Sequence, residues 1–221
     1  VTEAVLDEAI ALGYNLVISH HPLIFKGYKS ITGKDYVERC ILKAIKNDIV
    51  IYSAHTNLDN AYGGVNYKIA EKIGLKNLQV LEPKENSLQD DLMQAGAGIV
   101  GELDEPETEL EFLKRIKKTF EVGCVRHNRL TGREIQKVAL CGGAGAFLLP
   151  QAIRAGADVF ITGEIKYHDY FGHEGDILMA EIGHYESEQY TKEIFYSIIR
   201  DLFPNFALQS SKINTNPIKY L

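Results

Sequence analysis

The sequence predicts an α/β fold, because short apolar segments alternate with longer segments of helical periodicity along most of the chain. The short segments are rich in β-branched residues and end at turn residues, as buried strands do. The chain has 221 residues, 45% of them hydrophobic and 24% charged, which is enough for one large domain or two small ones. The alternation is typical of a parallel or mixed sheet flanked by helices.

In the first part of the chain, turn residues separate the expected elements. Thr2 is a suitable N-cap for a first helix that ends at Gly13, and Gly63-Gly64 precedes a later helix. Because the helical pattern starts at once and Val1 is not a start methionine, we expect a preceding segment, including a first strand, to be missing. In order, we expect a helix at residues 2–12, a strand at 15–19, a helix at 34–46, a strand at 49–53 and a helix at 65–73.

The second part of the chain repeats this organisation after a polar, turn-rich stretch at residues 82–88. We interpret that stretch as a boundary between an N-terminal part, residues 1–88, and a C-terminal α/β lobe, residues 89–221. Beyond it we expect, in order, a strand at 97–103, a helix at 107–120, strands at 121–125 and 137–140, a helix at 148–155, strands at 158–162 and 177–180, a helix from 183 to 202 and a last strand at 206–209.

Charge and cysteine content exclude several classes of protein. The net charge of −6 argues against an electrostatically driven nucleic-acid binder, which needs clustered Lys and Arg. Cys40, Cys124 and Cys141 lie in apolar segments, so we expect reduced core thiols and a cytoplasmic protein. No apolar run reaches the roughly 18 residues of a membrane span, so we expect no membrane partner.

Histidines and carboxylates follow three of the expected strands, at the edge where α/β sheets bind ligands. His20 and His21 follow residues 15–19, His55 and Asp59 follow 49–53, and His184 and Glu188 follow 177–180. The four-residue spacing of His184 and Glu188 places both on one face of a helix, where they can chelate one ion.

Each of these patterns has a structural alternative: unrelated loop histidines, a solvent-facing helix pair, or an ordinary carboxylate before a helix. Taken together, however, the donors would suit two ions that share a bridging carboxylate. Zinc, manganese, iron and nickel all fit such a mixed ligand set.

Two further segments are candidates for substrate binding. Gly142, Gly143 and Gly145 lie between a strand and a helix, where backbone N–H groups can bind a phosphate, although tight strand–helix packing explains the glycines equally well. Lys166 and His168 follow another strand end, and surface charge is the alternative interpretation for them.

Five sequence blocks together resemble one known family. SHHPLIF from Ser19, AHTNLD from Ala54, GGAGAFL from Gly142, DVFITGEIKYHD from Asp158 and GHYESE from Gly183 are similar to the NGG-interacting factor three family. Bacterial members of that family are named GTP cyclohydrolase 1 type 2 homologues. The blocks occur in the expected order and span most of the chain.

The resemblance implies a specific site and assembly. The family's dinuclear metal site falls on His20, His21, Asp59, His184 and Glu188, with Asp59 and Glu188 as bridging carboxylates and His55 as a further ligand or a neighbour of the ligands. It also implies two related α/β lobes with the metals between them, and a toroidal homohexamer. Longer members carry a PII-like domain, which we would place near Leu88-Gln89.

The function implied is that of a metal-dependent hydrolase-like protein that acts on GTP, as a cyclohydrolase, or on a small nucleotide phosphoester. A metal-bound water would be the nucleophile, so no side chain is assigned as the catalytic residue. The alternative is a non-catalytic metal-binding hexameric ring that acts as a regulatory or partner-binding module, in which the ring interior could differ in charge from the rest of the surface.

Overall fold

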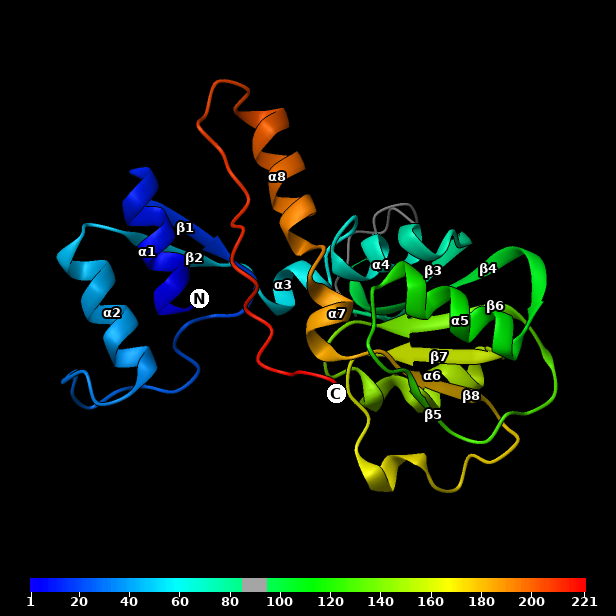
Figure 1. The fold of residues 1–221 in the computed structure, drawn as a ribbon. Coiled ribbons are helices and arrows are strands. Elements are labelled where there is room, and N and C mark those ends of the chain that lie inside the picture. The colour runs from blue at the N-terminus through cyan, green and yellow to red at the C-terminus, as the bar shows by residue number, and fades with distance from the viewer. Residues whose placement is uncertain (85–94) are drawn as a thin grey trace. The chain divides into compact units, whose positions relative to one another are not determined.

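The computed structural model describes residues 1–84 and 95–221, and these form a mixed α/β fold with sheets flanked by helices (Figure 1). The described residues divide into two units. The first comprises Val1–Leu58 and Lys192–Lys219, and the second comprises Asp59–Thr191 and Tyr220–Leu221. The boundary expected at residues 88/89, with any inserted domain there, lies outside the described residues.

The first unit is built on a pair of parallel strands. Its regular elements begin with α1 (Glu3–Leu12), β1 (Leu16–Ser19), α2 (Tyr36–Lys46) and β2 (Val50–Ser53). The expected caps are confirmed for α1: the Thr2 side chain accepts a hydrogen bond from the Val5 amide, and Gly13 has a left-handed φ of 74°. Leu6 of α1 and Cys40 of α2 are fully buried, and both helices pack on the inner faces of the strands.

The C-terminal part of the first unit differs from the expectation. The helix expected from 183 to 202 is two helices, α7 (His184–Glu188) in the second unit and α8 (Thr191–Leu202). Residues 206–209 form no strand. Instead, the tail is held to α1, since Glu8 accepts hydrogen bonds from the Ser211 hydroxyl and the Lys212 amide.

The second unit contains a six-stranded mixed sheet. Its strand order is β3-β4-β6-β7-β8-β5, with parallel pairing of β6 with β7 and of β7 with β8 and antiparallel pairing elsewhere. The strands are β3 (Lys76–Pro83), β4 (Gly96–Thr108), β5 (Arg126–His127), β6 (Glu134–Cys141), β7 (Val159–Thr162) and β8 (Leu178–Glu181).

Helices cover this sheet and bury its apolar residues. They are α4 (Val65–Ile73), α5 (Glu109–Thr119) and α6 (Leu149–Arg154), and the same unit contains the short α7. The short helix α3 (Thr56–Asp59) spans the point in the sequence where the first unit gives way to the second. Figure 1 shows α5 in front of the sheet and α6 behind it. Ala152 of α6 packs with Phe160 and Met179 of the strands, and all three are fully buried.

Two strands of this sheet differ from the sequence prediction. β3 was not expected. Its sequence mixes polar residues with Leu78, Val80 and Leu81, and as an edge strand it pairs only with β4 within the described sheet. The strand expected at 121–125 is wrong, since Glu121 has a positive φ of 54° and the strand is the shorter Arg126–His127.

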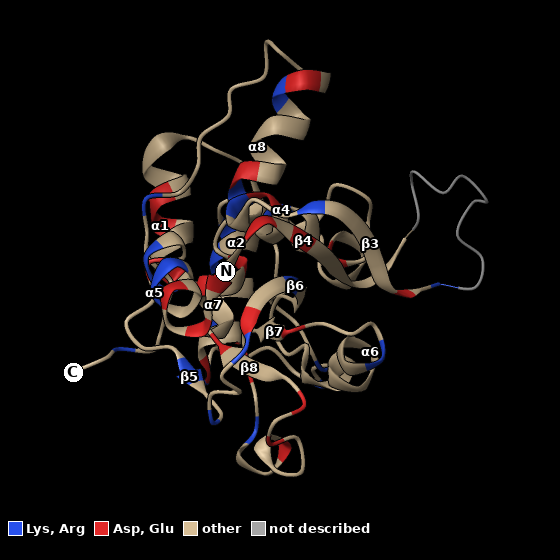
Figure 2. Ribbon diagram, turned by 90° about the vertical axis from the view of Figure 1, so that its right-hand side faces the viewer, with Lys and Arg blue, Asp and Glu red and all other residues tan. Residues whose placement is uncertain are grey.

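Acidic and basic residues are interspersed along the ribbon (Figure 2), and in several helices they follow the helix dipole. In α5, for example, Glu109 and Glu111 occupy the first turn and Lys117 and Lys118 the last. This placement stabilises individual helices.

The cysteines are free thiols, as expected. Cys40 and Cys141 are buried, but Cys124 is exposed, so the expectation of a core position is wrong for that residue. Within residues 1–84 and 95–221, no helix combines the length and apolar character that crossing a bilayer requires.

Candidate metal centre

Parallel pairing of β1 and β2 brings their carboxyl ends together. Ser19 is opposite Ser53, and their hydroxyl oxygens lie 2.8 Å apart. The chain leaves strand geometry directly after Ser19, whose hydroxyl donates to the His21 carbonyl oxygen at 3.0 Å. As the sequence predicts, this break allows two adjacent histidines to face the same way.

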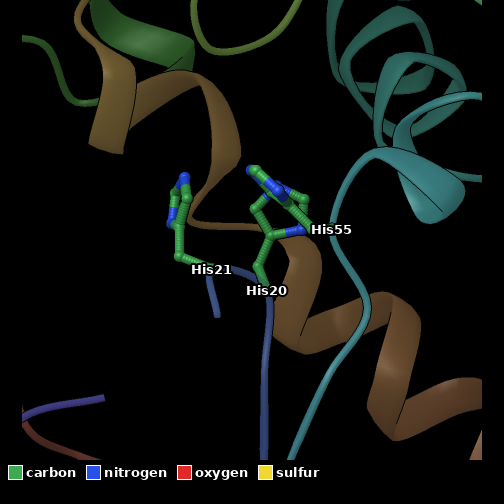
Figure 3. A group of neighbouring side chains, drawn as sticks. All are labelled: His20, His21 and His55. Atoms are coloured by element: carbon green, nitrogen blue, oxygen red, sulfur yellow. The ribbon is translucent and has the colours of Figure 1, made fainter. Parts of the chain in front are cut away.

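The first unit contains a cluster of three histidines at these strand ends. Figure 3 shows His20 and His21 extending in the same direction beside His55. The ring centroids are 4.8 Å apart for His20 and His21, 5.3 Å for His20 and His55, and 5.2 Å for His21 and His55. One nitrogen from each ring lies within 4.8 Å of the others, so the cluster could hold a metal ion.

The tautomer of His20 fits a metal ligand. Its Nδ1 atom lies 2.9 Å from the carbonyl oxygen of Ala54, and because a carbonyl can only accept, Nδ1 is the donor. In the neutral ring the lone pair is then on Nε2. Metal-binding histidines commonly have this arrangement, in which a backbone carbonyl fixes the ring orientation.

Sequence reasoning did not single out Phe25, which borders the histidine cluster. Its ring centroid is 5.7 Å from that of His55 and 6.5 Å from that of His21, yet 66% of the residue is exposed. The sequence did contain a signal for Phe25, which lies only four residues after His21 in the segment SHHPLIF. An aromatic residue this close in sequence to a histidine pair is a candidate neighbour of those histidines.

In the second unit, His184 and Glu188 lie on one face of α7, as their four-residue spacing predicts. Nε2 of His184 lies 3.1 Å from Oε2 of Glu188, and Nδ1 of the same ring lies 2.7 Å from Oε1 of Glu164. The hydrogen bond to Glu188 outweighs burial of the ring and, with Glu164, raises the pKa of His184 to about 9. A divalent cation would compete with that proton for the same two atoms, so the pair fits a metal.

Asp59 ends α3, and the structure brings its carboxylate near Glu188. One oxygen of each lies within 4.8 Å of the other. Burial, together with these two carboxylates, raises the pKa of the Cys141 thiol to about 12. Cys141 therefore stays protonated at neutral pH, in agreement with a donor set of imidazoles and carboxylates only.

The glycine loop after β6 packs against α7. The amides of Gly142, Gly143 and Gly145 donate to the side chains of Asn66, Ser187 and Thr162 respectively, at 2.9, 3.0 and 2.9 Å. A Cβ at Gly163 would lie 2.9 Å from the His184 Cα, so that glycine also allows a close approach to α7. These contacts favour the packing interpretation of the loop, and Asn66, Ser187 and Thr162 are residues that sequence reasoning missed.

Lys166 and His168 lie on an exposed segment that includes the short 3₁₀ helix η2 (Tyr167–Tyr170). Ile165 beside them is buried and its amide donates to Glu181, which anchors the start of the segment in the second unit. Both side chains are thus open to solvent, where they could meet a ligand.

The chain matches known proteins over most of its length. The family model for Duf34/NIF3 (NGG1p interacting factor 3) matches residues 1–217. A protein of Lactococcus lactis named GTP cyclohydrolase 1 type 2 homolog is 33% identical over 227 residues, which cover 98% of this chain and 81% of that protein. A protein of the same name from Clostridium perfringens is 37% identical over 190 residues, covering 85% of this chain and 70% of its own length.

Solved structures show the same fold. A Bacillus cereus protein related to NIF3 is 26% identical with a TM-score of 0.87, over 100% of this chain and 87% of that one. A Staphylococcus aureus hypothetical protein is 32% identical with a TM-score of 0.90, over 100% and 84% of the two chains. With the family model matching nearly the whole sequence, the chain belongs to the Duf34/NIF3 family.

Proposed function

We propose that this chain is a dinuclear-metal-dependent hydrolase-like protein. Two divalent ions would be held by five residues, with His55 as a further ligand or a neighbour of the ligands. The proposed ligands are His20, His21, Asp59, His184 and Glu188.

The observation that carries the proposal is the histidine cluster of the first unit. One nitrogen of each of three imidazoles lies within 4.8 Å of the others at the ends of β1 and β2, and imidazole nitrogens are the commonest metal ligands in proteins. The hydrogen bond from His20 Nδ1 to Ala54 adds the tautomer that a ligand needs.

The carboxylates of the second unit support two ions rather than one. Asp59 and Glu188 have oxygens within 4.8 Å of each other, a spacing that suits carboxylates bridging two cations. A single catalytic zinc needs only three protein ligands, so the proposed set exceeds its requirement. The family resemblance further supports a proposal of two related α/β lobes with the metal ions between them.

The proposed reaction is hydrolysis of a nucleotide. It would either open the imidazole ring of the guanine base in GTP or cleave the phosphoester of a small nucleotide. Bound divalent ions would supply Lewis acidity, which lowers the pKa of water and polarises the electrophile. Lys166 and His168 are the proposed contacts to substrate phosphates. Support for GTP is the name shared by the Lactococcus and Clostridium relatives.

We also propose that the chain assembles into a toroidal homohexamer and acts in the cytoplasm. Free cysteines favour a reducing compartment. The mass of the assembly, measured by light scattering, tests the ring: six copies support it and a monomer contradicts it.

Metal content and turnover together test the proposed function. Protein loaded with Mn²⁺, Zn²⁺, Fe²⁺ or Ni²⁺ should contain two ions per chain and release product from GTP or from bis(p-nitrophenyl) phosphate. Asp59→Ala should abolish turnover, whereas His127→Ala, at an exposed histidine, should not. Turnover that survives Asp59→Ala would reject the assignment, and two bound ions without turnover on any nucleotide would favour the non-catalytic ring.

A further inference from the structure

Glu164 contacts the proposed ligand His184 on the side away from Glu188. Its Oε1 atom lies 2.7 Å from His184 Nδ1, a distance typical of a charge-assisted hydrogen bond. Nε2 of the same ring lies 3.1 Å from Oε2 of Glu188. The imidazole is thus held at both nitrogens, by one carboxylate from the loop after β7 and one from α7.

The backbone around Glu164 is well anchored. The amides of Gly163 and Glu164 both donate to the Gly143 carbonyl oxygen, at 2.9 and 3.1 Å. The next residue, Ile165, is 4% exposed, and its amide donates to Glu181 at 3.2 Å. The Glu164 side chain therefore starts from a fixed point after β7 and reaches the first residue of α7.

The contact provides an acceptor for the proton on Nδ1 of His184. An ionised carboxylate can only accept, so Nδ1 is the donor and, in the neutral ring, the lone pair is on Nε2. Nε2 is also the atom that faces Glu188. A histidine with water at Nδ1 would populate both tautomers and rotate more freely, and would bind a cation less tightly.

Stability alone does not account for the contact. The Glu164 side chain is 58% exposed, and exposed ion pairs contribute little to folding because water screens them. Exposure does not remove the geometric preference of the hydrogen bond between Glu164 and His184. The contact can therefore orient the imidazole ring while contributing little to the stability of the fold.

We propose that Glu164 is a positioning residue that holds His184 with Nε2 directed at the metal. The inference rests on the proposed function, because it needs His184 to be a ligand. It adds a residue outside the five proposed ligands and assigns it an effect on metal affinity.

The test is Co²⁺ binding by the full chain. Calorimetry measures the affinity, and visible absorption reports the coordination of the bound ion. Glu164→Ala should weaken binding about 10- to 100-fold, the usual effect of losing such an outer contact, and should change the absorption spectrum. Glu164→Gln should lose less Co²⁺ affinity than Glu164→Ala, because the amide oxygen of glutamine can still accept a hydrogen bond from His184 Nδ1. Glu174→Ala also removes one exposed carboxylate and is the charge-matched control. This variant should bind Co²⁺ as tightly as the wild type does.

A second measurement separates positioning from a structural role. Urea unfolding without metal should give the same midpoint for Glu164→Ala and wild type. Wild-type affinity and spectrum in Glu164→Ala would overturn the inference alone, as would an affinity loss matched by an equal loss of metal-free stability. A wild-type chain that binds no Co²⁺ would overturn the proposed function and this inference with it.

Discussion

Gly143 lies against Glu188, so closely that a Cβ at position 143 would overlap Oε1 of the glutamate. The same Cβ would lie 3.3 Å from Nε2 of His184. Gly143 also has a φ of 61°, in the left-handed region. The glycine thus leaves room for two proposed ligands.

Gly143→Ala should therefore impair metal binding as well as stability. The left-handed backbone costs about 1–2 kcal/mol for a non-glycine residue, and displacement of Glu188 should lower Co²⁺ affinity about tenfold or more. Gly156→Ala is the matched control, since its φ is 69° and nothing lies within 4 Å of the added Cβ. The control should lose stability and keep wild-type affinity. Equal affinities in the two variants would contradict the role given to Gly143.

Metal should stabilise the chain through the histidine cluster. At a free metal concentration of 100 times Kd, the free energy of unfolding should rise by about 2.7 kcal/mol, and a chelator should remove this gain. His20→Ala should lose most of it, because the cluster loses the ring whose tautomer Ala54 fixes. His127→Ala should retain it. Thermal unfolding with and without Mn²⁺ measures both, and an undiminished gain in His20→Ala would show that His20 is no ligand.

A tryptophan at position 25 should report metal binding directly. The chain has no tryptophan, so Phe25→Trp introduces a single indole, next to His21 and His55. Cu²⁺ and Ni²⁺ quench indole fluorescence at short range, so stoichiometric metal should quench this variant strongly. Tyr36→Trp, at a residue of α2 that is 55% exposed, should be quenched much less. Similar quenching of both would place the metal elsewhere.

Acid should destabilise the first unit through Glu38. Burial opposes ionisation of this carboxylate, but hydrogen bonds from the amides of Thr32, Gly33 and Lys34 and from the Thr32 hydroxyl prevail and lower its pKa from 4.5 to about 2. Because the folded pKa is below the unfolded one, the stabilisation is complete above pH 4.5 and is lost as the pH falls through about 2.

Urea unfolding of wild type and Glu38→Gln at a series of pH values checks this prediction. The wild type should be the more stable near neutral pH, and the difference in unfolding free energy should shrink as the pH approaches 2. The glutamine keeps the shape of the side chain but does not titrate. A difference that stays constant across this range would contradict the assigned pKa.

Local chemistry was enough to predict much of the fold. The helix at Glu3–Leu12 was predicted by its cap and glycine stop, and β1 and β2 by β-branched runs between turn residues. These signals are local, because they depend on neighbours along the chain. The edge strand β3 and the break between α7 and α8 were missed, since pairing with β4 and packing of Tyr190 against Phe120 depend on distant residues.

The candidate site also has some features that the sequence predicts and others that depend on the tertiary structure. The sequence by itself determined which donors are present and that His184 and Glu188 share a helix face, because residue type and helical spacing are properties of the chain. Only the tertiary structure decided that three imidazoles converge at the ends of β1 and β2, that Asn66, Ser187 and Thr162 engage the glycine loop, and that Glu164 contacts His184. Those relationships join residues far apart in the sequence, and strand register and loop packing set them.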